Sequence, residues 1–163
     1  MTADWEQRLA DLWASTDDYG EEELVERMES LISELPAGSA IASYERASAF
    51  DSTGHSDRAV PLYREALERG LDDDRRRQAV IQLASSLRNL GEAAESVALL
   101  SAEREAASDE LDDAVDAFLA LALVDAGRER EAVSMALLAL SRHMTRYQRS
   151  LVSYARELAA APR

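Results

Sequence analysis

The sequence predicts an all-α fold: an α-solenoid of stacked antiparallel helix pairs, with about nine helices and no strands. Nearly half of the 163 residues are hydrophobic, but only 6% are aromatic, and Ala and Leu dominate the apolar set. This composition favours closely packed helices over a β-sandwich. Four glycines, Gly20, Gly54, Gly91 and Gly127, follow one another at intervals of 34, 37 and 36 residues. A fixed period of this length indicates repeated helix pairs.

The same helical pattern precedes and follows each of these glycines. Apolar residues recur three and four positions apart, which places them on one stripe of each helix. Small residues such as Ala120 and Ala132 allow two helices to approach closely, and Gly between the helices can take the positive φ that ends a helix. One pair cannot bury its outer stripe alone, so we expect the pairs to stack.

The elements are expected in this order within one domain, residues 1–163. An N-terminal helix pair occupies 3–38 and departs from the repeat pattern, because Trp13 stands where the repeat has a small residue. Three repeats follow at 39–71, 75–106 and 109–141. A helix at 144–160, with Arg opposite its apolar side, is expected to cap the stack.

The order of small, large, Gly, small, aromatic and small residues, with a period slightly above 34, resembles tetratricopeptide repeats. The stretch from Gln78 to Gly91, together with the acidic N-terminal pair, is similar to small bacterial proteins with the group 5 tetratricopeptide domain. The resemblance implies a superhelical repeat fold, no established reaction, and a non-catalytic scaffold that binds a protein or peptide partner.

The resemblance also implies a binding surface. In such repeats the first helix of each pair faces a concave groove, and its inward positions carry polar side chains here. The corresponding residues, which we predict to contact a peptide, are Tyr44, Gln78, Gln82, Ser85, Arg88 and Asn89, with Ser48 beside them. Amides, a hydroxyl and a guanidinium on a rigid helix suit an extended peptide. Ordinary solvated side chains are an equally compatible interpretation.

The helix at 111–124 is apolar on all sides after Asp116, so every side should be buried. Its face with Ala117, Leu121 and Val124 needs a cover: the C-terminal helix, a second copy of the chain or a ligand. Residues 1–35 hold eleven acidic residues against two Arg, whereas 142–163 hold five Arg against one Glu. A self-assembling homodimer without a peptide ligand is therefore the alternative function.

Catalytic and cofactor chemistry is not expected. Without Cys, thiolate metal sites and disulfides are excluded. His55 lies near Asp51 and Ser56, but three polar residues in one turn cannot orient one another as a triad does. The stripe of Asp109, Asp112 and Asp116 lacks calcium-loop spacing and is interpreted as a solvated helix start. We therefore expect no catalytic residue, cofactor or metal.

Charge and hydropathy limit the partners and the compartment. The net charge of −14 opposes binding to nucleic acid, and the run at 75–77, three Arg directly after three Asp, is interpreted as a charged helix start. No apolar run is long enough to cross a membrane, and the acidic N-terminus lacks a secretory h-region. We expect a cytoplasmic, bacterial protein.

Overall fold

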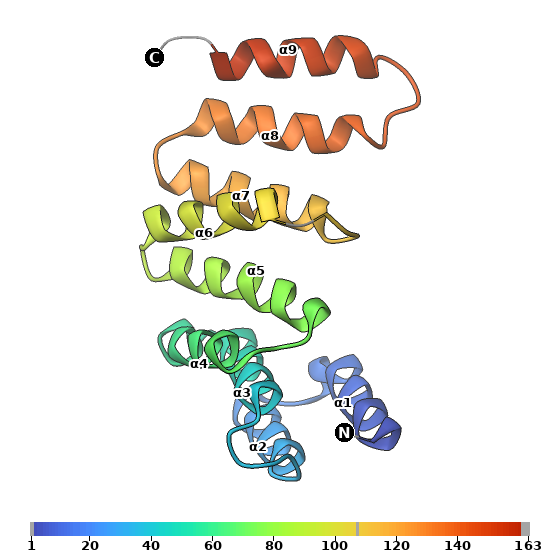
Figure 1. The fold of residues 1–163 in the computed structure, drawn as a ribbon, viewed down its shortest axis with the longest axis vertical. Helices are drawn as coiled ribbons and strands as arrows, with labels where there is room; N and C mark the ends of the chain where they lie inside the picture. The colour runs from blue at the N-terminus through green and yellow to red at the C-terminus, as the bar shows by residue number, and fades with distance from the viewer. Residues whose placement is uncertain (1, 107, 161–163) are drawn as a thin grey trace. The chain divides into compact units, whose positions relative to one another are not determined.

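A computed structural model describes residues 2–106 and 108–160. Within these residues the chain forms nine α-helices, one short 3-10 helix at Thr16–Asp18 and no strand (Figure 1). The helices are α1 (Ala3–Ala14), α2 (Glu21–Ile32), α3 (Ala40–Ser52), α4 (Ser56–Arg69), α5 (Asp73–Asn89), α6 (Ala93–Ala106), α7 (Asp112–Asp125), α8 (Glu129–Ser141) and α9 (Gln148–Ala160). The predicted all-α class is confirmed.

The chain divides into two compact units, residues 1–86 and 87–163, and the division falls within α5. In the first unit, α3 packs against α2 on one side and α4 on the other. In the second, α7 packs against both α6 and α8, and α9 packs against α8. Figure 1 shows α7, α8 and α9 joined at alternating ends, so these neighbours are antiparallel.

Three of the four periodic glycines form the same turn. Gly54, Gly91 and Gly127 have φ of +78°, +85° and +71°, a conformation that strains any residue with a Cβ. In each turn, the residue after the Gly donates its backbone N–H to a carbonyl five residues earlier: His55 to Phe50, Glu92 to Leu87 and Arg128 to Leu123, at 2.8 to 2.9 Å. This pattern ends the first helix of each pair.

Gly20 does not share this geometry, which corrects the expectation that all four glycines end a helix. Its φ is −73°, and it is the N-cap of α2 rather than a C-terminal residue of α1. A 3-10 turn connects α1 and α2 instead. The N-terminal pair therefore keeps the interval of the repeat but not its turn.

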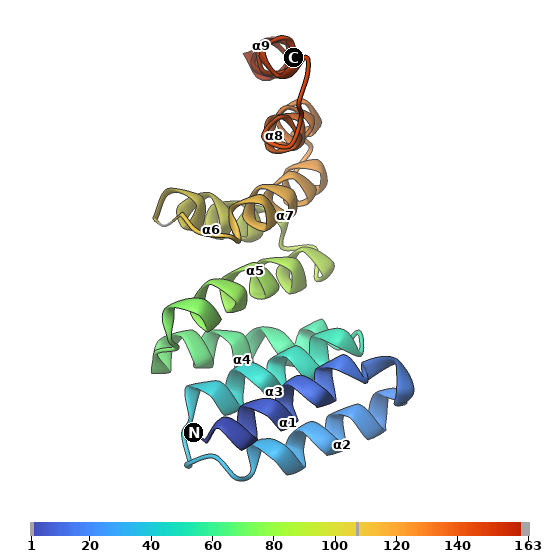
Figure 2. The same ribbon diagram turned by 90° about the vertical axis from the view of Figure 1, so that its right-hand side faces the viewer.

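The core of the N-terminal helix pair is apolar and contains one side-chain hydrogen bond that joins the two helices. Trp5, Leu9, Met28, Leu31 and Ile32 are buried together with Ala49 of α3. The indole N–H of Trp5 donates to the backbone carbonyl of Leu31 at 3.0 Å. This bond satisfies a buried donor and fixes α1 against the end of α2. Figure 2 shows α1 and α2 connected at one end and running in opposite directions.

Ala120 and Ala132 are both buried, with 8% and 2% of their surface exposed, in the neighbouring helices α7 and α8. We expect Ala120→Leu and Ala132→Leu each to lower the free energy of unfolding by about 1–3 kcal/mol, because a close helix contact cannot accept the added volume. Urea titrations followed by circular dichroism measure this. Ala117→Leu on the exposed side of α7 is the control and should change little; unchanged stability of both buried variants would contradict the packing.

Candidate binding pocket of the first unit

The first unit contains a pocket with a volume of 710 Å³. Three helices contribute stripes of side chains at helical spacing, and a fourth contributes Tyr63. The lining residues used below are Glu6 and Trp13 from α1; Tyr44, Glu45, Ser48 and Asp51 from α3; Tyr63 from α4; Asp72, which directly precedes α5; and Asp74, Arg75, Gln78 and Gln82 from α5. Residues four apart on a helix point to the same side, so each of these helices turns its own set of side chains toward the pocket.

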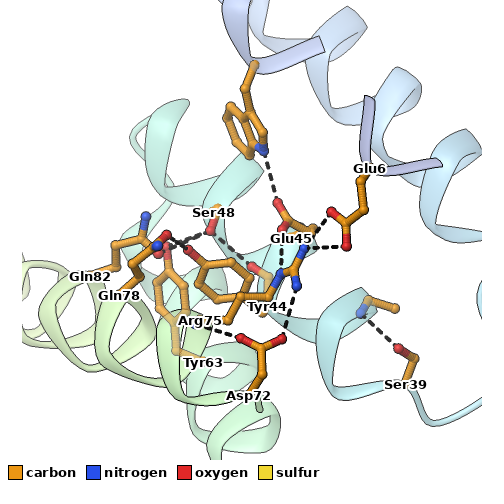
Figure 3. A network of polar contacts seen from close by, with 12 residues as sticks. Glu6, Ser39, Tyr44, Glu45, Ser48, Tyr63, Asp72, Arg75, Gln78 and Gln82 are labelled. Carbon is orange, nitrogen blue, oxygen red and sulfur yellow. Dashed lines mark hydrogen bonds and ion pairs between the residues drawn. The ribbon is translucent and has the colours of Figure 1, made fainter. Parts of the chain in front are cut away.

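Arg75 joins the walls of the pocket (Figure 3). Its guanidinium donates to both carboxylate oxygens of Glu6 at 2.6 and 2.8 Å, and to Asp72 at 3.0 Å. Glu45 lies close to it as well, with 3.8 Å between Arg75 Nε and Glu45 Oε1. One guanidinium thus faces carboxylates from α1, from α3 and from the residue before α5.

Glu45 is a buried carboxylate, with only 3% of its surface exposed. Its Oε2 accepts the indole N–H of Trp13 at 2.9 Å. Burial raises the pKa of Glu45 to about 7, although the Trp13 hydrogen bond and the charge of Arg75 act in the opposite direction. The carboxyl group therefore changes its charge near neutral pH.

Two glutamines that line the pocket are oriented by hydroxyl groups. The hydroxyl of Tyr44 donates to Gln78 Oε1 at 3.1 Å, and that of Ser48, whose one proton is shared with the backbone carbonyl of Tyr44, lies 3.2 Å from Gln82 Oε1. Each glutamine accepts through its oxygen, so its NH₂ group is directed elsewhere and can donate to a ligand. Burial raises the pKa of Tyr44 to about 12, so this hydroxyl stays protonated and remains a donor.

The structure brings together part of the predicted peptide site. Tyr44, Gln78 and Gln82 line the pocket with Ser48. Ser85, Arg88 and Asn89 lie further along α5 and do not line it. Arg88 belongs to the second unit, where its Nε lies 2.9 Å from an oxygen of Asp125. Sequence reasoning did not assign Glu45, Trp13 or Arg75 to the site. It treated Trp13 only as a departure from the repeat pattern and 75–77 only as a charged helix start.

The face with Ala117, Leu121 and Val124 is exposed in the single chain, so of the three covers expected for it, the C-terminal helix does not supply one. Leu121 and Val124 are 48% and 46% exposed. The C-terminal helix α9 packs against α8 and leaves this face open. Its three residues are one turn apart on α7, so they form a continuous apolar strip.

The prediction of a solvated acidic stripe at the start of α7 is wrong for Asp116. Asp116 is 2% exposed and accepts from Arg104 at 2.6 Å and from Arg142 at 2.7 Å. Asp113 accepts from His143, at 2.7 Å, and from Arg142, and both contacts lower its pKa. These partners lie 12 to 30 residues away in sequence, so the local pattern did not reveal them. A buried carboxylate requires such pairing.

The other residues considered for catalysis are placed as follows. His55 Nδ1 lies 3.2 Å from Thr53 Oγ1, while Ser56 donates to Asp51 at 3.2 Å. The three groups of the turn thus do not form a relay from Ser through His to Asp. Across residues 2–106 and 108–160, no group of three or more His, Cys, Asp or Glu side chains is placed to hold a metal ion.

The repeated turns and the packed helix pairs agree with a comparison to known families. Residues 40–158 match the family model of the group 5 tetratrico peptide repeat. The chain belongs to the tetratricopeptide repeat family. Tetratricopeptide repeat proteins are typically non-catalytic and generally mediate protein interactions. The match also confirms the predicted α-solenoid class.

A search of the curated proteins found no match to the sequence. In the part of the chain that the structure describes, no helix combines the length and the apolar character that a membrane crossing needs. Helix α1, which forms one wall of the pocket, lies outside the residues matched by the tetratricopeptide family. The pocket is thus built from repeat helices together with a helix outside them.

The pKa of Glu45 gives a testable pH dependence. The folded pKa of about 7 lies above the ordinary value of 4.5, so the folded state binds the proton more tightly than the unfolded state. Stability contributed by this proton is present below about pH 4.5 and is lost as the pH rises through 7. We expect wild type, relative to Glu45→Gln, to lose up to about 3 kcal/mol between these limits.

Urea denaturation of both proteins at pH 5 and pH 8, followed by tryptophan fluorescence, measures this difference. Gln keeps the size of Glu and an oxygen that can accept from Trp13, so the comparison isolates the charge. Glu26→Gln on the exposed side of α2 is the matched control. If the difference between wild type and Glu45→Gln is the same at both pH values, Glu45 does not titrate in this range.

Proposed function

We propose that this tetratricopeptide repeat protein is a non-catalytic scaffold that binds a protein or peptide partner through the concave surface of its repeats. In the first unit, the pocket with Tyr44, Gln78 and Gln82 is the part of that surface that contacts the partner. The family relationship supports the general role, and the geometry of the two glutamines supports the location.

The oriented amides carry this proposal. Gln78 and Gln82 are one turn apart on α5, and their oxygens accept from Tyr44 and Ser48. Two NH₂ groups on a rigid helix can donate to successive carbonyl groups of an extended chain. Because Tyr44 and Ser48 hold the amides before binding, little side-chain freedom is lost when a peptide is bound.

Site-specific photo-cross-linking tests the location. A benzophenone amino acid replacing Gln82 should form a covalent adduct with the partner in cells. The same amino acid at Glu68, exposed on α4, should not. Gln78→Leu keeps the approximate size of the side chain but removes the donor. It should reduce the yield of the adduct at position 82 about fivefold or more, as expected for a lost hydrogen bond. Equal adducts from positions 82 and 68, or none from 82, would contradict the proposed surface.

A second candidate function, self-association, is favoured by the open apolar face of α7. Ala117, Leu121 and Val124 leave this face uncovered in the single chain, and a second copy would bury it. The acidic N-terminal region and the Arg-rich C-terminal region add opposite charges that two copies could bring together. In this function the α7 face is a homodimer interface and no peptide is required.

Sedimentation velocity decides whether this face associates. We expect wild type to form a dimer and Leu121→Glu to be monomeric, because a carboxylate in an apolar interface must be desolvated. Leu121 is already exposed, so the variant should keep its circular dichroism spectrum and melting temperature. Val133→Glu, at an apolar residue of similar exposure (47%) on α8, is the control and should remain dimeric. A monomeric wild type at high concentration would remove this candidate.

A further inference from the structure

The pocket of the first unit holds more negative charge than its own cation neutralises. Five carboxyl groups line it, from Glu6, Glu45, Asp51, Asp72 and Asp74, against a single guanidinium, and Glu45 becomes charged as the pH rises through its pKa of about 7. That guanidinium, Arg75, is already paired with Glu6, Asp72 and Glu45. A ligand that enters the pocket therefore meets a strongly negative potential, which favours a cation and opposes an anion.

Glu45 supplies a specific acceptor for such a cation. Its Oε2 is occupied by the Trp13 indole, but its Oε1 has Arg75 Nε only at 3.8 Å, which is beyond hydrogen-bond distance. Within the described residues, this oxygen is ion-paired with Arg75 but accepts no hydrogen bond. It is not one of the fully enclosed polar atoms without a partner, so a donor on a ligand in the pocket can reach it.

Aromatic rings complete the site. Trp13, Tyr44 and Tyr63 all line the pocket, and the rings of Tyr44 and Tyr63 lie 6.2 Å apart between centroids. The two tyrosine hydroxyls are already used, toward Gln78 and toward Ser48. The rings therefore present apolar surface, which suits the alkyl stem of a long basic side chain and attracts its charge.

We propose that this pocket binds a lysine or arginine side chain of the partner polypeptide, with Glu45 Oε1 accepting a hydrogen bond from the cation. This inference rests on the proposed function, because it names the part of the partner that the pocket selects. The volume of 710 Å³ is sufficient for a long side chain with its flanking backbone. The backbone would then lie at the mouth of the pocket, next to the NH₂ groups of Gln78 and Gln82.

The two tryptophans of the chain allow a direct test by NMR. Trp13 contacts Glu45 in the pocket, whereas Trp5 is buried against Leu31 and reports on the fold. The probes are short blocked Gly-Ser peptides with one central residue: lysine, arginine, norleucine or glutamate. We expect the lysine and arginine peptides to shift the indole N–H signal of Trp13 saturably and to leave that of Trp5 unchanged. The norleucine peptide, which has a similar chain without the charge, should cause no shift.

Variants test the role of Glu45. Glu45→Gln should lower the affinity for the lysine and arginine peptides at least about tenfold, because a charge-assisted hydrogen bond becomes a neutral one. Glu26→Gln should bind as wild type does. An unchanged Trp5 signal shows that each variant is folded.

Three results would overturn the inference: equal binding of the norleucine peptide, unchanged affinity of Glu45→Gln, or no Trp13 shift with any basic peptide at millimolar concentration. Preferential binding of the glutamate peptide would also overturn it, but would leave the pocket as a peptide site. The proposed function is decided separately, by the cross-linking at Gln82.

Discussion

The pocket depends on the contacts of one side chain, Arg75. Its guanidinium joins Glu6 of α1 to the start of α5, with Asp72 and Glu45 beside it. Glu6 and Arg75 are 69 residues apart, so no local preference of the chain brings them together. The pair is only partly exposed, which strengthens the attraction relative to a surface ion pair but also adds a desolvation cost. Together with the Trp13–Glu45 hydrogen bond, it holds α1 as a wall of the pocket.

Most of the fold could be predicted from the sequence because its determinants are local. The positive-φ glycines at 54, 91 and 127 mark where the first helix of each pair ends, and the apolar stripes show which sides are buried. Gly20 shows the limit of this approach: it keeps the interval of the repeat but caps the start of a helix. An interval alone does not determine the backbone geometry.

The candidate site could be predicted only in part. Tyr44, Gln78 and Gln82 could be predicted because the register of the repeat alone indicates which positions face inward. Glu45, Arg75 and Trp13 were not, since their interaction depends on how far side chains reach between different helices. Asp116 was missed for the same reason: its neighbours in sequence suggest a solvated helix start, while its Arg partners come from the ends of α6 and α8. Charged residues are therefore the least predictable, because a distant partner decides whether they can be buried.

The position of α1 also has a consequence for how the chain opens. Helix α9 packs against α8, and its detachment breaks that interface. Helix α1 has Glu6–Arg75 and Trp13–Glu45 contacts that reach both α5 and α3. Detachment of α1 therefore requires several separate contacts to break together. Amide hydrogens of α1 should accordingly exchange with solvent in larger cooperative openings than those of α9, so that these two helices have different local dynamics.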